Sequence, residues 1–198
     1  MAEPLTVWHT EHVNFARLLD LLETQVAAFQ RGERPNYDLM ANIVYYLRSF
    51  GDRFHHPREE AAFARLVERD PSTQLIVNRV LQEHRVIAAA GDDFFNRLNE
   101  VAADVMTPRA TVEAAAATYL MYYRHHIAAE ERDIMPRAAQ QLTQEDWAAV
   151  TAAVPPDPLF GDVVEARFQE LRSQIAGDVR VLQQEQVSLP QALNLTQN

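Results

Sequence analysis

The placement of histidine constrains this chain more than any other feature, because the histidines fall into four groups along four stretches of helical character. The seven histidines are His9, His12, His55, His56, His84, His125 and His126. In two groups a glutamate follows a histidine four positions later: His55 pairs with Glu59, and His126 with Glu130. Residues four apart share one face of a helix and lie about 6 Å apart along its axis. The pattern therefore predicts helices that converge on a cluster of imidazole and carboxylate groups.

Four long helices are expected at 7–30, 37–68, 73–104 and 108–140, where apolar residues recur at steps of three and four. Breaks fall at 31–36, at 70–72 and at Thr107-Pro108, which is typical of a capping threonine followed by a first-turn proline. Pro57 falls inside the second helix, so a kink is expected there. No alternating segments are joined by a tight glycine turn. The sequence predicts an all-α fold, an antiparallel up-down-up-down four-helix bundle.

A C-terminal helical extension is expected beyond the four helices. A short helix that contains Trp147 should open at 143–146, with Asp146 in the capping position, and the proline-rich stretch 155–158 should end it. Another helix is expected at 161–175, followed by a polar, glutamine-rich tail. The predicted organisation is a bundle over 1–140, with an extension and tail over 141–198 that pack on it or serve a partner.

The histidine groups are predicted to lie at one depth of the bundle. In an antiparallel hairpin, residues equidistant from the turn lie level with one another. Positions 12 and 55 are equidistant from the break at 31–36, positions 59 and 84 from the break at 70–72, and positions 84 and 126 from residue 105, just before Thr107. Because the breaks are defined by helix-breaking residues and not by histidine, this agreement favours one shared site over scattered side chains.

An internal repeat supports the same site. Glu11-His12 recurs 72 residues later as Glu83-His84, and the pair at 55 and 59 recurs 71 residues later at 126 and 130. The chain therefore contains two copies of one hairpin, each with one histidine from its first helix and a histidine–glutamate pair from its second. Such a pseudo-twofold arrangement suits two metal ions bridged by two carboxylates.

Six residues are predicted to be metal ligands: His12, His55, Glu59, His84, His126 and Glu130. His55 continues the apolar stripe of its helix, whereas His56 shares a face with charged residues. The kink expected at Pro57 can rotate the residues beyond it, so His56 and Glu60 are kept as the alternative pair. His9 and His125 are expected to support the ligands or to lie at the surface.

The donor types restrict the metal. The chain has no cysteine, so thiolate ligation is excluded, and imidazole with carboxylate suits iron, manganese or zinc. We expect two iron ions bridged by oxide or hydroxide, with zinc or manganese as the alternative. Four histidines and two bridging glutamates supply roughly eight of the roughly twelve bonds that two six-coordinate ions need, and a bridging oxygen adds roughly two. Dioxygen, peroxide or nitric oxide could occupy the open positions. Tyr122 or Tyr123 could hydrogen-bond such a ligand, unless they are ordinary core aromatics.

Charge and hydropathy exclude several partners. The formal net charge of −10 argues against nucleic acid, whose phosphates need a basic surface. No apolar run is long enough to span a membrane, and the N-terminus lacks the pattern of a secretory signal. We expect a cytoplasmic protein that is a monomer or a homodimer.

The chain resembles the hemerythrin-like HHE cation-binding family, in its bacterial type. The resembling segments are Glu11-His12, 55–60, Glu83-His84 and 124–136, and the likeness covers about 5–140. The stretches 142–147 and 157–161 also resemble an extension of bacterial members. The resemblance implies a di-iron site in an up-down-up-down bundle.

Two departures from the oxygen carriers of that family bear on function. Those carriers have two histidines four apart on the third helix, but Val80 and Ala88 flank His84 at that spacing. Their fourth helix pairs histidine with aspartate at a spacing of five, whereas Glu130 stands four after His126. Unless His56 replaces the missing histidine, this argues against reversible oxygen carriage. The pattern is closer to bacterial members and to the iron-sensing domain of a mammalian ubiquitin-ligase subunit.

Function is expected to centre on the metals, because the sequence offers no recognisable catalytic set or substrate domain. The prediction is a di-iron protein that binds or senses dioxygen, nitric oxide or iron itself. The alternatives are an enzyme that consumes peroxide, similar to a catalase or peroxidase, and an iron- or zinc-handling protein without a redox role. Whether the protein is an enzyme is left open.

Overall fold

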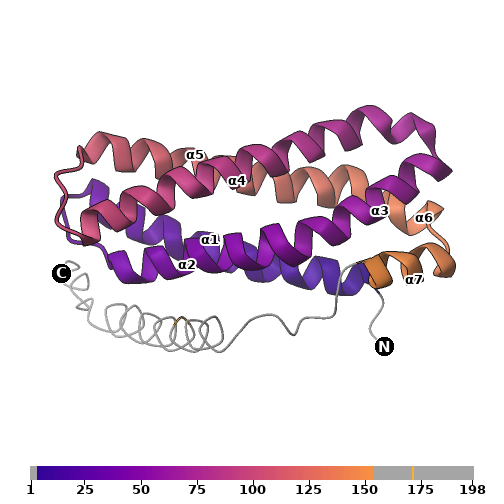
Figure 1. Cartoon of the computed structure of the whole chain (residues 1–198), viewed down its shortest axis with the longest axis horizontal. Helices are drawn as coiled ribbons and strands as arrows, with labels where there is room; N and C mark the ends of the chain where they lie inside the picture. The colour runs from indigo at the N-terminus through magenta and orange to yellow at the C-terminus, as the bar shows by residue number, and fades with distance from the viewer. Residues whose placement is uncertain (1–3, 154–170, 172–198) are drawn as a thin grey trace, which may run out of the picture. The chain divides into compact units, whose positions relative to one another are not determined.

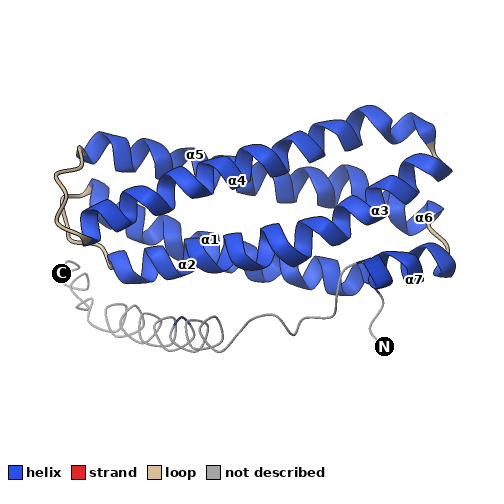
Figure 2. Ribbon diagram, in the orientation of Figure 1, coloured by secondary structure: helices blue, strands red, loops and turns tan. Residues whose placement is uncertain are grey.

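The computed structural model describes residues 4–153 and residue 171. The chain divides into two compact units, 1–159 and 160–198, and the first is called the helical body. Within the described residues every regular element is a helix, joined to the next by a short loop or turn (Figure 2). The expectation of an all-α fold is confirmed for this part of the chain. The expected helix at 161–175 and the polar tail lie outside the described residues.

Long helical stretches run side by side along the body (Figure 1). The α-helices are α1 (Pro4–Gln30), α2 (Tyr37–Phe50), α3 (His56–Arg69), α4 (Gln74–Ala102), α5 (Arg109–Ala129), α6 (Met135–Gln141) and α7 (Gln144–Ala153). The 3₁₀ turn Pro71–Thr73 lies between α3 and α4. α1 packs against α2 and α5, and α4 packs against the same two helices. The helices therefore enclose a common interior.

Two π-helical turns interrupt the second and fourth stretches. Gly51–His55 joins α2 to α3, and Glu130–Ile134 joins α5 to α6. Each turn lies just before a proline, Pro57 or Pro136, at the start of the next helix. Proline donates no backbone hydrogen bond and crowds the preceding turn, and a wider turn relieves this. The kink expected near Pro57 is thus a π-helical turn, and Pro136 has a similar one that was not expected from the sequence.

The helix starts agree with the sequence except at α1, which begins at Pro4, three residues earlier than expected, and at α5. The side chain of Asn36 caps α2 by accepting from the amide of Leu39 at 3.0 Å. Thr107 was expected to cap the fourth stretch, and this prediction was wrong. α5 begins at Arg109 with Pro108 in the cap position, and the Thr107 hydroxyl donates to Glu100 instead.

The predicted cap of α7 is present. The carboxylate of Asp146 accepts from the amide of Thr143 at 2.9 Å, and the Thr143 hydroxyl accepts in return from the amide of Asp146 at 3.3 Å. Asp146 also accepts two bonds from Arg69 of α3, at 3.1 and 3.2 Å. Cap and ion pair together hold α7 against α3.

The interior is apolar on either side of a polar layer. Toward α6 and α7 lies a cluster that includes Trp8, Phe63, Leu66, Val77, Ile134 and Val150. Toward the turns at the other end, Leu22, Ile43, Leu47, Phe94 and Tyr119 are fully or almost fully buried. The histidine groups lie between these two regions. Among the described helices, none combines the length and apolarity that crossing a membrane would require.

Candidate metal centre

Two groups of buried donor atoms meet in the polar layer. One group consists of His12, His55, Glu59 and Glu130, and the other of His56, Glu59, His84 and His126. Within each group the donor atoms lie within 4.8 Å of one another, and every member is buried. Glu59 belongs to both groups. All six residues predicted as ligands are therefore brought together, and His56 joins them.

The two glutamates connect the groups. Glu59 places Oε1 2.7 Å from Nε2 of His55 and Oε2 3.4 Å from Nε2 of His84. Glu130 places Oε2 3.2 Å from Nε2 of His12 and Oε1 3.3 Å from Nε2 of His126. Each carboxylate thus directs one oxygen to each group, which is the disposition that a bridging carboxylate requires.

Both adjacent histidines of the second stretch face the interior, at 2% exposure for His55 and 4% for His56. In a regular helix, neighbouring side chains point about 100° apart, so one of the two would turn away. His55 ends the π-helical turn Gly51–His55 and His56 begins α3. The wider π turn rotates less per residue and so lets two consecutive side chains reach one site. The choice between the two histidines posed by the sequence does not arise.

Each of the five histidines directs Nε2 inward and Nδ1 toward an acid. The Nδ1 partners are Glu131 for His12 at 2.8 Å, Glu11 for His55 at 2.7 Å, Asp52 for His56 at 3.3 Å, Glu60 for His84 at 3.2 Å and Glu83 for His126 at 3.4 Å. An acid on one ring nitrogen keeps the proton there and leaves the other nitrogen free to bind a cation. These five acids therefore orient the five imidazoles.

The supporting acids are placed by further contacts. Arg58 donates to Glu11, and the Arg79 guanidinium lies 3.4 Å from Glu83. His9 approaches Glu131 at 2.9 Å. These bonds reach outward, so the site is held from its interior to the protein surface.

The role of the supporting acids was not predicted from the sequence, although the repeat contained their signal. Glu11 and Glu83 are the acids of the repeated Glu-His pairs, yet each bonds the histidine of the neighbouring helix rather than its own neighbour. Glu60, kept as an alternative ligand, is half exposed and contacts Nδ1 of His84. His9 and His125 are mostly exposed, as expected.

The centre contains polar atoms that lack partners. Ten buried side-chain nitrogen and oxygen atoms of the described residues have no hydrogen-bond partner, and six of them belong to this centre. They are Nε2 of His56, His84 and His126, Oε2 of Glu59, and both carboxylate oxygens of Glu130. An unsatisfied buried polar group costs about 1–3 kcal/mol. Six such atoms lie together here, and all of them can donate lone pairs. This arrangement suits the binding of cations.

One protein donor competes for the same space. The indole N–H of Trp8 donates to Nε2 of His12 at 3.1 Å. The same nitrogen lies 3.1 Å from Nε2 of His55. A cation bound by the two imidazoles would take the lone pair that Trp8 now uses.

The buried carboxylates favour positive charge on the imidazoles beside them. Burial lowers the pKa of His12, but the nearby carboxylates of Glu130, Glu131 and Glu59 outweigh this and raise the pKa to about 11. The pKa of His84 is raised to about 11 in the same way, through Glu130, Glu59 and Glu60. The carboxylates around these two imidazoles therefore favour a positive charge at the centre, which a metal ion could supply.

Glu59 and Glu130 are ionised despite their burial. Burial raises the pKa of Glu59, but His55, His12 and His84 lower it well below its usual value. For Glu130, burial and the charge of Glu59 act upward, and His126 and the other histidines bring the pKa down. For His56, burial lowers the pKa against the opposing effect of Asp52. The centre thus offers carboxylates and a neutral imidazole, the forms that bind metals.

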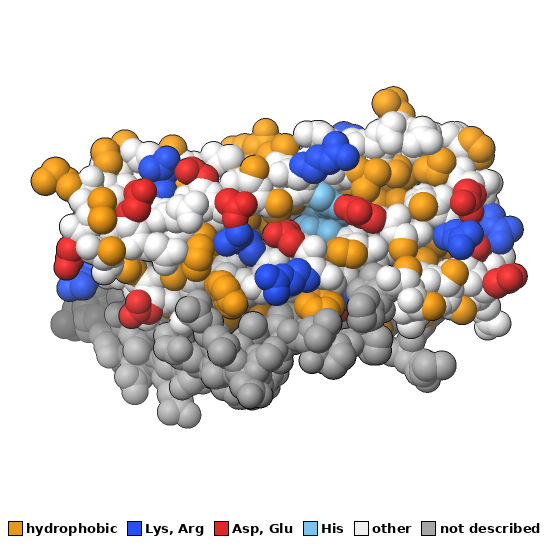
Figure 3. Space-filling view, viewed as in Figure 1, with side chains coloured by type: hydrophobic (Ala, Val, Ile, Leu, Met, Phe, Trp, Pro, Cys, Tyr) orange, Lys and Arg blue, Asp and Glu red, His pale blue; other side chains and the backbone are white. Residues whose placement is uncertain are grey.

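The centre approaches the protein surface at mid-length of the body. Figure 3 shows histidine atoms flanked by acidic side chains near the middle of the visible face. The supporting acids are in part exposed, whereas the inner donors are buried.

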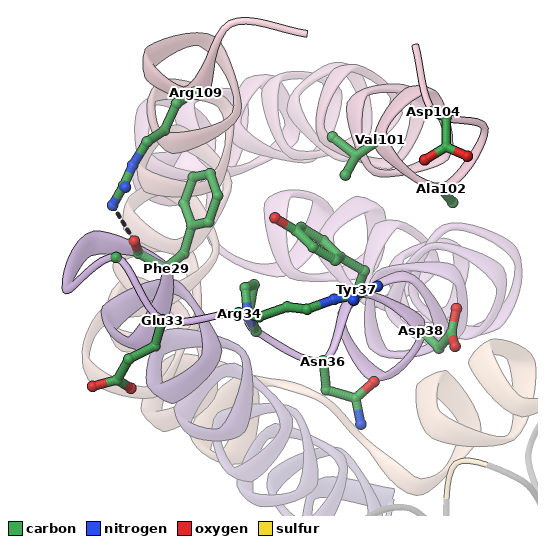
Figure 4. A pocket seen from close by; sticks show the side chains of 12 residues that line it. Phe29, Glu33, Arg34, Asn36, Tyr37, Asp38, Val101, Ala102, Asp104 and Arg109 are labelled. Atoms are coloured by element: carbon green, nitrogen blue, oxygen red, sulfur yellow. Dashed lines mark hydrogen bonds between the residues drawn. The ribbon is translucent and has the colours of Figure 1, made fainter. Parts of the chain in front are cut away.

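A separate pocket of about 840 Å³ lies where α1 turns into α2 and α4 turns into α5 (Figure 4). Arg109 donates to the backbone carbonyl of Phe29, and its guanidinium lies over the Phe29 ring at 4.6 Å. Arg34 and Arg109 share the lining with Glu33 and Asp104, so the charge is mixed. The lining includes no histidine and lies several helical turns from the metal centre.

Comparison with known proteins identifies one family. The family model described as the hemerythrin HHE cation binding domain matches residues 3–138. No curated protein matches the chain, and no solved structure does. The matched range contains both donor groups and all five supporting acids.

Proposed function

The chain belongs to the hemerythrin HHE cation-binding family, and from this premise we propose that it is a non-haem di-iron protein that binds or senses a small ligand such as dioxygen, nitric oxide or iron itself. The observation that carries the proposal is the pair of glutamates, each of which directs one oxygen to either histidine group. Two donor groups that share carboxylates suit two ions better than one.

The proposed architecture is the antiparallel up-down-up-down four-helix bundle. It is supported by the packing of α1 and α4 against both α2 and α5, and by the short turns that join successive stretches. The division into a bundle over 1–140 and an extension over 141–198 remains a prediction from sequence. The proposed packing of the extension on the bundle is supported for α7 by the Arg69–Asp146 pair. A cytoplasmic location and a monomeric or dimeric state remain predictions from sequence.

The proposed ligand set contains seven residues: His12, His55, His56, Glu59, His84, His126 and Glu130. Five histidines and two bridging glutamates supply roughly nine of the roughly twelve bonds of two six-coordinate ions, and a bridging oxide or hydroxide adds roughly two. Roughly one position is then left for an exogenous ligand. The position belongs to the ion held by His12 and His55, because the other ion has three histidines.

The two metal positions differ because the internal repeat is broken at one point. The residues 71 positions after Asp52 and His56 are Tyr123 and Ile127. The first hairpin therefore supplies an additional histidine and its supporting acid, whereas the second supplies a tyrosine and an isoleucine. This asymmetry gives one saturated and one open position, and the fifth histidine removes the argument against reversible ligand binding that a count of four had raised.

The residues of the chain would bind and orient two iron ions. These ions would supply electrons and an open coordination position. Glu131 and Glu11 hold Nδ1 of His12 and His55, so that both Nε2 atoms point to the open side of the centre. The surrounding apolar residues exclude bulk water. A centre held in this way suits reversible binding of a small molecule.

The decisive experiment is metal analysis of the full chain purified from cells without added metal, with optical spectra before and after air. We expect two iron ions per chain and a spectral change when the reduced protein meets oxygen. One ion per chain or none would contradict the proposal. Zinc alone would favour metal handling, and rapid peroxide turnover by the iron-loaded protein would favour an enzyme.

A further inference from the structure

The metal centre has two sides along the helix axes, and they differ in chemistry. Glu59 and Glu130 stand one turn beyond His55 and His126 on the side of α6 and α7, followed by the apolar cluster around Phe63. The opposite side is formed by the residues one turn from each histidine in the other direction. These are Phe15, Gly51, Asp52, Ile87 and Tyr123, of which Asp52 directs its carboxylate to Nδ1 of His56.

Tyr123 has the only buried polar side chain among those five residues, because Asp52 is 31% exposed. The side chain is 1% exposed, and its hydroxyl has no hydrogen-bond partner. The ring lies 5.9 Å from that of Phe15, which in turn packs edge-on against His55 at 4.7 Å. A buried hydroxyl without a partner is costly, so its position beside the centre calls for an acceptor.

Gly51 shows where the hydroxyl lies. A Cβ atom added to Gly51 would lie 2.9 Å from Oη of Tyr123 and 3.9 Å from Nε2 of His56. The hydroxyl therefore lies at the edge of the space that a side chain at position 51 would fill, and the ring of His56 borders the same space. A glycine at the start of the π-helical turn leaves room for it.

The hydroxyl keeps its proton. Burial raises the pKa of Tyr123 well above its usual value, and the charges of Asp52, Glu59 and Glu130 act in the same direction. Tyr123 is therefore a hydrogen-bond donor without an acceptor, on the side of the centre that the glutamates do not occupy.

We propose that the hydroxyl of Tyr123 donates a hydrogen bond to the small ligand held at the open side of the centre, and so raises the affinity for ligands that have a hydrogen-bond-accepting atom. The ligand class is a diatomic or triatomic species with a free lone pair, such as dioxygen, peroxide or azide. Tyr123 is a positioning residue in this role. The inference rests on the proposed function, because it needs a ligand at the metals.

Neighbouring tyrosines supply the controls. Tyr122 lies beside the exposed Met121 on the outer face of α5 and is 40% exposed, so Tyr122→Phe removes a hydroxyl that points away from the centre. Tyr119 stands one turn further from the histidines, with its ring 5.6 Å from that of Tyr123. Its hydroxyl is also buried without a partner, and Tyr119→Phe tests whether distance from the centre matters.

The test is azide titration of the full chain loaded with oxidised iron, followed by its optical spectrum. Tyr123→Phe should retain two irons and bind azide about five- to tenfold more weakly, the loss expected for one hydrogen bond. Tyr122→Phe and Tyr119→Phe should stay within about twofold of the wild type. Gly51→Ala, whose Cβ displaces the hydroxyl, should weaken azide binding as Tyr123→Phe does.

A second readout needs no metal. Because the hydroxyl has no protein partner, metal-free Tyr123→Phe should unfold at the same temperature as the wild type or higher. A clear decrease would show that the hydroxyl bonds to protein, and the inference would be overturned. Unchanged azide affinity in Tyr123→Phe would also overturn it and leave the proposed function standing. A wild type that takes up no iron, or binds no azide, would end both.

Discussion

Glu131 Oε1 lies 2.8 Å from Nδ1 of His12, so an acid of the fourth helical stretch orients an imidazole of the first. The two residues are 119 positions apart in sequence. Along the chain, α1 is the first element to contribute a residue to the centre, and the π-helical turn after α5 is the last. The bond therefore links the first and fourth helical stretches directly. Mutation of the supporting acid is therefore a direct test of the centre.

Glu131→Ala should weaken metal binding without removing a ligand. Loss of such a supporting acid typically costs about 10- to 100-fold in metal affinity, because the imidazole loses its orientation and its basicity. The measurement is iron retention against a chelator series. Glu145→Ala, which removes an exposed acid of α7, is the control and should retain iron as the wild type does. Equal retention by both variants would contradict a supporting role for Glu131.

His56→Ala should lower the iron content from two ions per chain toward one. The proposed ligand set gives His56 to the ion that also binds His84 and His126, so its loss affects one ion more than the other. Metal analysis of the purified variant measures this. His125→Ala is the matched control, because that side chain is 58% exposed. A variant that keeps two tightly bound ions would remove His56 from the ligand set.

Removal of the metal should destabilise the fold. Six buried donor atoms of the centre have no hydrogen-bond partner in the protein, and a ligand present at about 100 times its Kd stabilises a protein by about 2.7 kcal/mol. For a domain of this size we expect the unfolding temperature to fall by about 5–10 °C after chelation. Calorimetry before chelation, after it, and after reloading with iron checks this. An unfolding temperature that does not respond to iron would argue against the site.

The packing of α7 against α3 should weaken at acidic pH, because Asp146 then becomes protonated. The bonds from Thr143 and Arg69 lower the pKa of Asp146 to about 2, below the usual 3.8. A lowered pKa in the folded state means that the stabilisation is complete above about pH 4 and disappears as the pH falls toward 2.

Asp146→Asn should therefore unfold at a lower temperature than the wild type at neutral pH, and the difference should shrink between about pH 4 and pH 2. Thermal unfolding followed by tryptophan fluorescence, to which Trp147 of α7 contributes, is the measurement. Glu145→Gln, one position earlier on an exposed face, should show no such trend. A difference independent of pH would contradict a role for the Asp146 charge.

Much of the helical framework was accessible to sequence reasoning. The breaks at 31–36 and 70–72 were recognised from proline, glycine and polar residues, and the periodic apolar positions between them form buried faces, as Leu22 and Leu47 show. These signals are local, since helix faces and helix ends depend on residues a few positions apart. The equal depth of His12, His55 and His126 followed from counting residues outward from the turns.

The sequence by itself determined where the helices run and at which level their histidines stand, because regular rise and rotation turn residue number into position. Only the tertiary structure decided which atoms meet. The π-helical turn before Pro57 directs both His55 and His56 inward, and no periodicity of 3.6 residues contains that information. Pairs such as Glu11 with His55 or Glu131 with His12 join different helices, and their partners depend on how the helices pack rather than on neighbours in the chain.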